Sequence, residues 1–178
     1  MNVRLIAGQY GGRIIKTPGG GRTHPMSERI RGSLFNILQD ISDLDVCDAF
    51  AGSGSVGLEA LSRGAKFVTF LENDRRAQRT IVRNIATLDV EEETKMIKTS
   101  VFSWHHSSPD TMFDLILCDP PYWDMQMATV SLLVSHLKPN GLMVLSHPGR
   151  ESAPTVNGVV VVDKRSYGDA ALAFYRLD

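Results

Sequence analysis

The stretch Asp48-Ala49-Phe50-Ala51-Gly52-Ser53-Gly54-Ser55-Val56-Gly57 decides the fold of this chain. Its glycines follow the spacing G-x-G-x-x-G, and they stand between an apolar run at 46–50 and a helical pattern at 56–63. In parallel α/β sheets this spacing marks the turn from a strand into a helix, where a ligand can lie against the backbone. The spacing alone is a weak signal, so its weight depends on the elements around it.

Beyond the glycine loop, short apolar runs alternate with helical patterns, as is typical of β-α-β units. Strands are predicted at 46–50, 67–72, 94–99, 113–118, 142–145, 159–162 and 171–175, and helices at 56–63, 75–88 and 125–137. The loop at 166–169 is too short for a helix, so the last two strands are predicted to form an antiparallel hairpin. We therefore expect an α/β, Rossmann-like fold with a seven-stranded, mostly parallel sheet that ends in this hairpin.

The N-terminal part is predicted as a basic arm over residues 1–26, with a small hairpin around Gly11-Gly12. The main domain follows at 27–178, with a leading helix at 27–39 capped by Ser27 and the sheet from about residue 45. Residues 1–31 carry six basic side chains against one acid, whereas the remaining residues carry thirteen basic and nineteen acidic ones. A basic end on an acidic body indicates contact with a polyanion, although a solvated terminus explains the charge equally well.

Length and composition predict one globular domain, because 178 residues with 43% hydrophobic and 22% charged side chains are ordinary for such a chain. No apolar run approaches the ~20 residues of a membrane span, and none near the N-terminus resembles a signal peptide. Cys47 and Cys118 lie in apolar runs, which favours buried free thiols and a cytoplasmic location. No Cys/His spacing indicates zinc, so no metal is expected.

Two acids narrow the choice of ligand for the glycine loop. Glu72 ends the next strand, twenty residues after Gly52, where an acid can hold ribose hydroxyls. Asp48 would oppose a pyrophosphate at the loop but suits the positively charged amino-acid end of S-adenosylmethionine. Asp48 bonded only to turn amides and Glu72 as a surface acid remain the alternatives. The predicted cofactor-binding residues are Asp48, Phe50, Ala51, Gly52, Ser53, Gly54, Gly57, Glu72, Asn73, Ser100, Val101 and Asp119.

The strongest signal is Asp119-Pro120-Pro121-Tyr122, which directly follows the apolar strand at 113–118. An exocyclic amino group is a poor nucleophile, because the aromatic ring delocalises its lone pair. The Asp119 carboxylate and the Pro120 carbonyl can accept its two N–H bonds and direct the lone pair at a methyl group. Pro121 keeps the chain extended, and Tyr122 offers a stacking face worth ~1–3 kcal/mol. These four residues are therefore predicted as the catalytic core of an amino methyltransferase; a turn with an incidental tyrosine is the alternative.

The chain resembles the RsmD family of bacterial 16S ribosomal RNA guanine-N2 methyltransferases, which have a class I methyltransferase fold. The resemblance covers nearly the whole chain and rests on residues 4–8, 12–13, 23–31, 34–36, 48–65, 119–122 and 167–168. It implies S-adenosylmethionine as donor and, as acceptor, a guanine amino group of 16S ribosomal RNA in an assembled or assembling small subunit. It also implies that RNA phosphates are held by Arg4, Arg13, Arg29 and Arg31. The protein is expected to be a monomer.

Three positions depart from the family pattern. Gly32 stands where an acid is expected, His147 stands where a glutamate is common, and no acid occurs at Ser100-Val101 to hold an adenine amino group. A main-chain amide would have to make that adenine contact.

Three other functions are compatible with parts of the sequence. Asp-Pro-Pro-Tyr serves adenine and guanine alike, so an amino methyltransferase of another RNA or of DNA is the first alternative. A catalytically silent RNA-binding protein is the second, and the intact Asp119 argues against it. A nicotinamide oxidoreductase is the third, which Asp48 and the terminal hairpin disfavour.

Overall fold

The computed structural model describes residues 1–20 and 24–178; residues 21–23, part of the predicted arm and of its motif at 23–31, lie outside the described residues. The strands are β1 (Asn2–Arg4), β2 (Ile14–Lys16), β3 (Asp45–Ala49), β4 (Phe67–Leu71), β5 (Thr94–Ile97), β6 (Phe113–Cys118), β7 (Leu137–Pro148), β8 (Val159–Ser166) and β9 (Ala170–Leu177). The helices are α1 (Glu28–Leu38), α2 (Ser55–Ser62), α3 (Arg75–Leu88), α4 (Val101–Ser107) and α5 (Met127–Leu132), with 3-10 turns η1 (Glu91–Glu93) and η2 (Leu133–His136).

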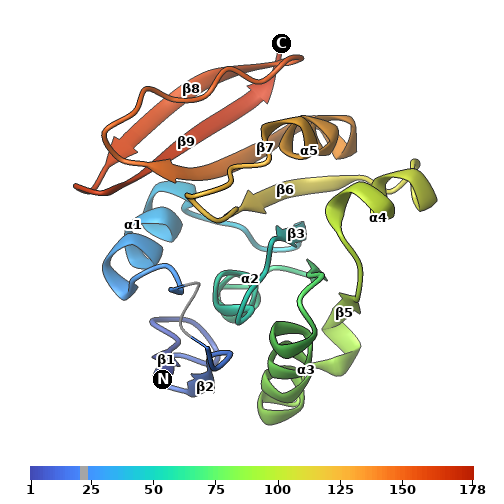
Figure 1. The fold of residues 1–178 in the computed structure, drawn as a ribbon. Helices are drawn as coiled ribbons and strands as arrows, with labels where there is room; N and C mark the ends of the chain where they lie inside the picture. The colour runs from blue at the N-terminus through green and yellow to red at the C-terminus, as the bar shows by residue number, and fades with distance from the viewer. Residues whose placement is uncertain (21–23) are drawn as a thin grey trace.

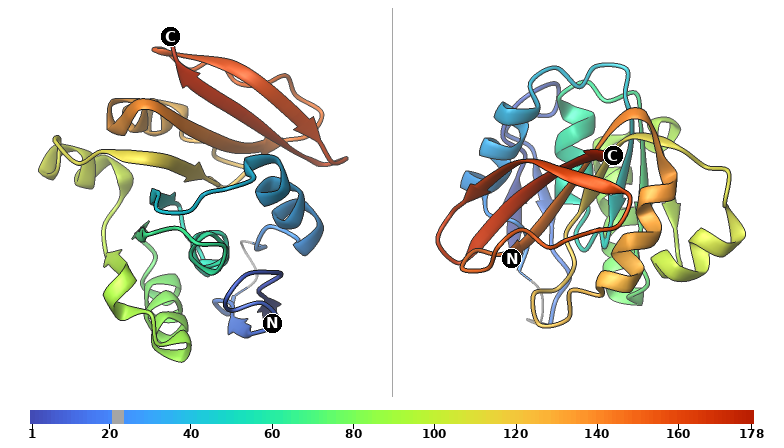
Figure 2. Two further views of the ribbon diagram at one scale, coloured as in Figure 1. Left: turned by 180° about the vertical axis from the view of Figure 1, so that it is seen from behind. Right: turned by 90° about the horizontal axis from the view of Figure 1, so that it is seen from above.

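The main sheet has the strand order β5-β4-β3-β6-β7-β9-β8 (Figure 1). Strands β5, β4, β3, β6 and β7 run parallel, whereas β9 pairs antiparallel with β7 and β8 (Figure 2). The predicted sheet and its terminal hairpin are confirmed. The chain leaves β3 toward β4 on one side and later returns to β6 on the other, so a crevice is expected outside the carboxyl ends of β3 and β6.

Both faces of the central strands β3, β4 and β6 are buried, because helices lie on each side of them. Along β6, Leu115 and Leu117 pack with residues of α1, α2 and α3, whereas Ile116 and Cys118 pack with residues of α4 and α5. This two-sided burial explains why β6 reads as a continuous apolar run. Cys47 and Cys118 are buried free thiols, as the sequence predicts.

Predicted and observed boundaries coincide for α3 and β6 and differ elsewhere. The helix predicted at 125–137 is shorter, because α5 gives way to η2 and Leu137 already begins β7. Residues 138–141, which lie between the predicted helix and the predicted strand at 142–145, belong to β7, and the register against β6 shifts there. The sequence did not predict α4, a short helix held by its Trp104, which is 2% exposed. The acidic run at 91–93 forms the exposed turn η1.

The N-terminal hairpin of β1 and β2 forms as predicted and packs on the main body. The backbone amides of Ile6 and Ala7 donate to the Glu59 carboxylate of α2, at 2.8 and 3.2 Å. Asn84 of α3 bonds both the amide and the carbonyl of Lys16. The arm is thus fixed to the two helices that follow β3 and β4. None of the helices in the described part of the chain has the length and apolar character that a bilayer crossing requires.

Candidate active site

The loops after β3, β4 and β6 meet at the carboxyl edge of the sheet. The amide of Ala51 donates to the carbonyl of Leu71 at 3.1 Å, which joins the glycine loop to the end of β4. The amide of Asp119 donates to the carbonyl of Ala49 at 3.3 Å, which joins the Asp-Pro-Pro-Tyr segment to the end of β3. The structure therefore brings together the glycine loop, Glu72 and Asp119, as their sequence positions predicted.

The glycines of the loop have two separate roles. Gly52 and Gly54 take positive φ values of 58° and 77°, which side chains with a Cβ rarely adopt. Gly57 lies on α2, and a Cβ there would stand 2.5 Å from the Phe70 ring and 2.9 Å from the Asp48 carboxylate. The third glycine therefore permits close packing of α2 on β4, while the first two shape the loop.

Glu72 is half-buried and holds the two neighbouring loops together. One carboxylate oxygen accepts from the Gly52 amide at 2.9 Å, and the other accepts from the Asp74 amide at 2.8 Å. An ionised carboxylate has about four acceptor positions, so about two remain for a ligand's hydroxyl groups. This geometry fits the predicted role of Glu72 in holding a ribose.

Asp48 is 2% exposed, and its carboxylate accepts from the Gly57 amide at 2.9 Å. Burial raises its pKa well above the usual range; the Gly57 bond opposes this, and the nearby Asp119 and Glu72 charges add to it. The alternative of a strand-end carboxylate bonded to a helix amide thus describes one of its contacts. Asp48 and Asp119 also line one narrow recess between the loop and α1, so the Asp48 carboxyl still borders the site.

Asp119 is poised to change charge near neutral pH. Burial raises its pKa from the ordinary 3.8 to about 6, with Ser146 acting in the opposite direction. At pH 7 the carboxylate is still mostly ionised, so it can accept a hydrogen bond from an amino group. Ser146 also bonds the Tyr122 hydroxyl at 2.6 Å, which fixes the aromatic ring beside the acid. Ser146 was not predicted as a site residue, because a serine near the end of β7 belongs to no recognisable motif.

The two prolines and the next aromatic residue complete the segment. Pro120 is buried, and its carbonyl accepts no hydrogen bond from any described residue, so it remains available as an acceptor. The Pro121 carbonyl accepts from the Asp124 amide at 2.9 Å, which closes a tight turn. Trp123 is 73% exposed beside Tyr122 and was not predicted as a site residue. Its signal was available in the sequence as a second aromatic residue directly after the motif.

Most of the remaining predicted cofactor residues have side chains that are buried or already hydrogen-bonded. Ser53 is buried, and its carbonyl accepts from the Asn84 side chain at 3.0 Å. Phe50 has a φ of 59° and packs on the core, whereas Asn73 is exposed. The Ser100 hydroxyl caps α4, and the Val101 side chain is buried, so only their backbone is free for an adenine contact.

The predicted RNA-binding arginines are in very different environments. The prediction that Arg31 binds RNA is wrong, because this side chain is fully buried. Its guanidinium group donates to the carbonyls of Arg4 and Met26 and to the Glu59 carboxylate. Arg4 is exposed but pairs with Glu28 at 3.0 Å. Arg13 is exposed and donates to the Thr87 carbonyl, and Arg29 is exposed. Arg4, Arg13 and Arg29 therefore remain predictions as phosphate ligands.

The departures from the family pattern are accommodated locally. Gly32 continues α1 and faces the Ile6 side chain, 3.5 Å from where its Cβ would be. The neighbouring Arg31 forms a buried contact with Glu59 at 3.5 Å. His147 is fully buried; its Nδ1 bonds the Pro148 carbonyl, while its Nε2 has no partner among the described residues.

The charge at the carboxyl edge is one-sided. Asp48, Glu72 and Asp119 lie close together, and no described Lys, Arg or His side chain forms an ion pair with any of them. A cationic ligand would be attracted to this place, whereas a pyrophosphate would be repelled. Across the described ranges, 1–20 and 24–178, no group of three or more His, Cys, Asp or Glu side chains is arranged to hold a metal ion.

The sheet order and the position of these loops are those of a class I methyltransferase fold. The ribosomal protein L11 methylase of Lactobacillus delbrueckii shares that fold, with a TM-score of 0.75 at 20% identity over 95% of this chain and 88% of that one. The chain belongs to the RsmD family, described as conserved hypothetical protein 95, which matches residues 3–176.

Two family relatives cover nearly the full chain. Ribosomal RNA small subunit methyltransferase D of Haemophilus influenzae is 32% identical over 98% of this chain and 93% of that protein. The solved structure of the Escherichia coli protein yhhF has a TM-score of 0.88 at 30% identity and covers 100% of this chain and 99% of that one.

Proposed function

We propose that this chain is a ribosomal RNA methyltransferase that uses S-adenosylmethionine to methylate the N2 amino group of a guanine in 16S ribosomal RNA. The reaction class is supported by its family and by relatives named ribosomal RNA small subunit methyltransferase D. The observation that carries the chemistry is the position of Asp119 and the free Pro120 carbonyl beside a cluster of uncompensated acids.

The residues around the glycine loop fit S-adenosylmethionine. Its ribose hydroxyls match the remaining acceptor positions of Glu72, and its positive charges match the acids at the carboxyl edge. When bound, this cofactor supplies an electrophilic methyl group. A dinucleotide would instead bring two negative charges toward Asp48 and Asp119, which argues against the nicotinamide alternative.

The catalytic step requires the amino group to be oriented and its lone pair to be released from the ring. The Asp119 carboxylate and the Pro120 carbonyl each accept one N–H bond of the amino group. Tyr122, held by Ser146, provides the face on which the base stacks. Once methylated, the nitrogen carries a positive charge and loses a proton readily. Positioning and electrostatics therefore supply the catalysis, and no strong base is needed.

The substrate that we propose is an assembled or assembling small ribosomal subunit, on which the protein acts as a monomer. The basic arm is attached to the same domain as the active site, so both could contact one folded RNA surface. Methylation of adenine, or of another RNA or DNA, remains the second candidate, because the two acceptors of Asp119 and Pro120 would orient either amino group.

The test is radiolabelled methyl transfer to small subunits that lack this modification, followed by mass spectrometry of the labelled nucleoside. The proposal expects N2-methylguanosine in 16S ribosomal RNA. Labelled N6-methyladenosine would show that adenine, not guanine, is the methylated base. The absence of methyl transfer to any small-subunit RNA would refute the proposed ribosomal RNA methyltransferase function. An Asp119→Asn protein that still binds S-adenosylmethionine is the control for label that transfers without this site.

A further inference from the structure

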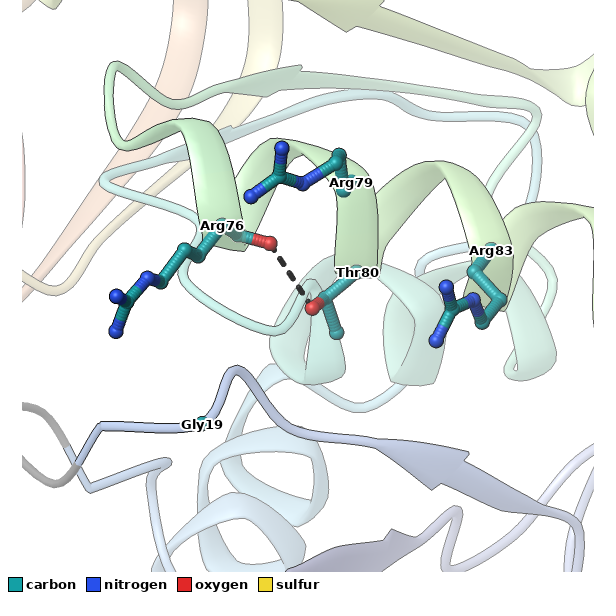
Figure 3. A pocket seen from close by; sticks show the side chains of 5 residues that line it. All are labelled: Gly19, Arg76, Arg79, Thr80 and Arg83. Carbon is teal, nitrogen blue, oxygen red and sulfur yellow. Dashed lines mark hydrogen bonds between the residues drawn. The ribbon is translucent and has the colours of Figure 1, made fainter.

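Helix α3 carries three arginines beside the N-terminal arm; Arg76 and Arg83 extend to the side of the arm, whereas Arg79 lies along the helix (Figure 3). Arg76, Arg79 and Arg83 are spaced by three and four residues, which places them on one side of the helix. With Thr80 and Gly19 they line a hollow of about 330 Å³ between the helix and the arm. The three guanidinium groups therefore border one shared concave surface.

No acid compensates these charges. All three arginines are exposed, and none forms an ion pair with a carboxylate in the described ranges. Residues 21–23 contain no acid either. The four charged residues of α3 are all arginine, whereas a helix face that is merely solvated usually carries charges of both signs. Repulsion among the row is therefore relieved only by a bound anion or by solvent and salt.

The positive charge continues onto the hairpin. Residues 1–20 contain no acid, and the exposed Arg13 of this segment donates to the Thr87 carbonyl near the end of α3. Exposed Lys16 is attached to α3 through the backbone bonds to Asn84. A basic stripe, defined here as Arg13, Lys16, Arg76, Arg79 and Arg83, thus runs along α3.

The stripe begins close to the site of methyl transfer. Asp74 caps the N-terminus of α3, and its own amide donates to Glu72, the predicted ribose ligand. Arg76 follows Asp74 by two residues and so lies at the carboxyl edge of the sheet. From Arg76 to Arg83 the helix rises about 10 Å, a length over which about three to four successive phosphates lie at about 3.4 Å for each nucleotide step.

We propose that Arg76, Arg79 and Arg83 bind consecutive backbone phosphates of the RNA strand that leads into the active site. The inference rests on the proposed function, because it takes the substrate to be RNA. Guanidinium groups form paired hydrogen bonds to phosphate oxygens, and the hollow lets a strand lie between α3 and the arm. The row positions the RNA and contributes affinity without reading its sequence.

The test compares three full-length variants. The first removes the charge (Arg76→Gln, Arg79→Gln, Arg83→Gln), and the second keeps it (the same three arginines replaced by lysine). The third is a matched control that removes three exposed charges in and beside the C-terminal hairpin (Arg150→Gln, Arg165→Gln, Arg176→Gln). Each is titrated with small ribosomal subunits that lack the modification, at constant Mg²⁺ and varied KCl, without donor. KM for subunits and the Kd for S-adenosylmethionine are measured in parallel.

Loss of three phosphate contacts should reduce the slope of log K against log salt by about 2–3. Between 50 and 200 mM salt, the wild-type protein should therefore lose roughly 20- to 40-fold more affinity than the glutamine variant. KM for subunits should rise by about 10-fold or more, while the Kd for S-adenosylmethionine stays unchanged, and lysine should restore most of the slope.

An unchanged slope and KM in the glutamine variant would overturn the inference, as would an equal loss in the control variant. A wild-type protein that binds subunits through the stripe but transfers no methyl group would refute the proposed function and still support this surface. The two proposals therefore fail in distinguishable ways.

Discussion

Replacing Asp119 with asparagine should stabilise the folded protein while stopping methyl transfer. Burial raises the pKa of Asp119 from 3.8 to about 6, so the charged carboxylate is less stable in the folded chain than in the unfolded one. At 1.36 kcal/mol for each tenfold change in the proton equilibrium, this difference corresponds to about 3 kcal/mol at pH 7. Asparagine has the same shape and no charge, so up to about 3 kcal/mol should be recovered.

The stability that asparagine adds depends on pH, because the pKa of Asp119 differs between the folded and the unfolded chain. Between pH 4 and 6 the unfolded chain loses the Asp119 proton while the folded chain keeps it, so the free energy of unfolding falls as pH rises through this window. The asparagine variant lacks this loss. Its advantage should be absent near pH 3.5, grow between pH 4 and 6, and stay constant above pH 7.

The assay is urea unfolding followed by circular dichroism at pH 3.5, 5 and 7.5, with thermal unfolding as a second measure. For a chain of this length, the gain at pH 7.5 should raise Tm by up to roughly 6–12 °C. Saturating S-adenosylmethionine should narrow the gap, because a cation stabilises the wild-type carboxylate. An asparagine variant that is equally or less stable at pH 7.5, or whose pH profile parallels the wild type, would refute this account of Asp119.

Three further changes test other contacts. Gly57→Ala should destabilise the fold by about 1–3 kcal/mol in urea unfolding, because its Cβ would stand 2.5 Å from the Phe70 ring; wild-type stability would contradict the packing role. Glu72→Gln should weaken S-adenosylmethionine binding by about 10-fold or more in calorimetry, since a charged acceptor for the ribose is lost; an unchanged Kd would remove Glu72 from the cofactor site. Arg31→Met should cost about 3–5 kcal/mol of stability in the same unfolding assay, because Glu59 is left buried without that partner; a neutral result would show that the remaining donors suffice.

The architecture could be predicted because local pattern and tertiary burial agree. In α3 the apolar residues Ile81, Ile85 and Leu88 recur at helical spacing and pack on the sheet, so the bounds of this helix were readable. Glycines placed between a strand and a helix located the loop, and Glu72 followed at the expected distance. Where burial rather than a hydrophobic pattern stabilises an element, as at Trp104 of α4, the element could not be predicted.

The environment of individual charges could not be predicted. Arg31 and Arg29 look equivalent in the sequence, yet α1 turns the first into the core, where Glu59 of α2 meets it, and leaves the second exposed. That pairing joins residues 28 positions apart and exists only after α1 and α2 have packed. The arginines of α3 lie on the polar side of a predicted helix. The hollow that they line together with Gly19 of the arm could not be predicted, because it forms only when the arm packs beside α3.

The attachment of the arm also sets the order in which the molecule can be completed during synthesis. The hairpin strands have three residues each, which is too little for independent stability. Their partners Glu59, Ser62 and Asn84 come 52 to 68 residues later in the chain. At about 5–20 residues per second, roughly 3–14 seconds pass between the synthesis of Lys16 and that of Asn84. The arm can therefore complete its packing only after α2 and α3 have been made, and until then its basic side chains have no folded surface to pack on.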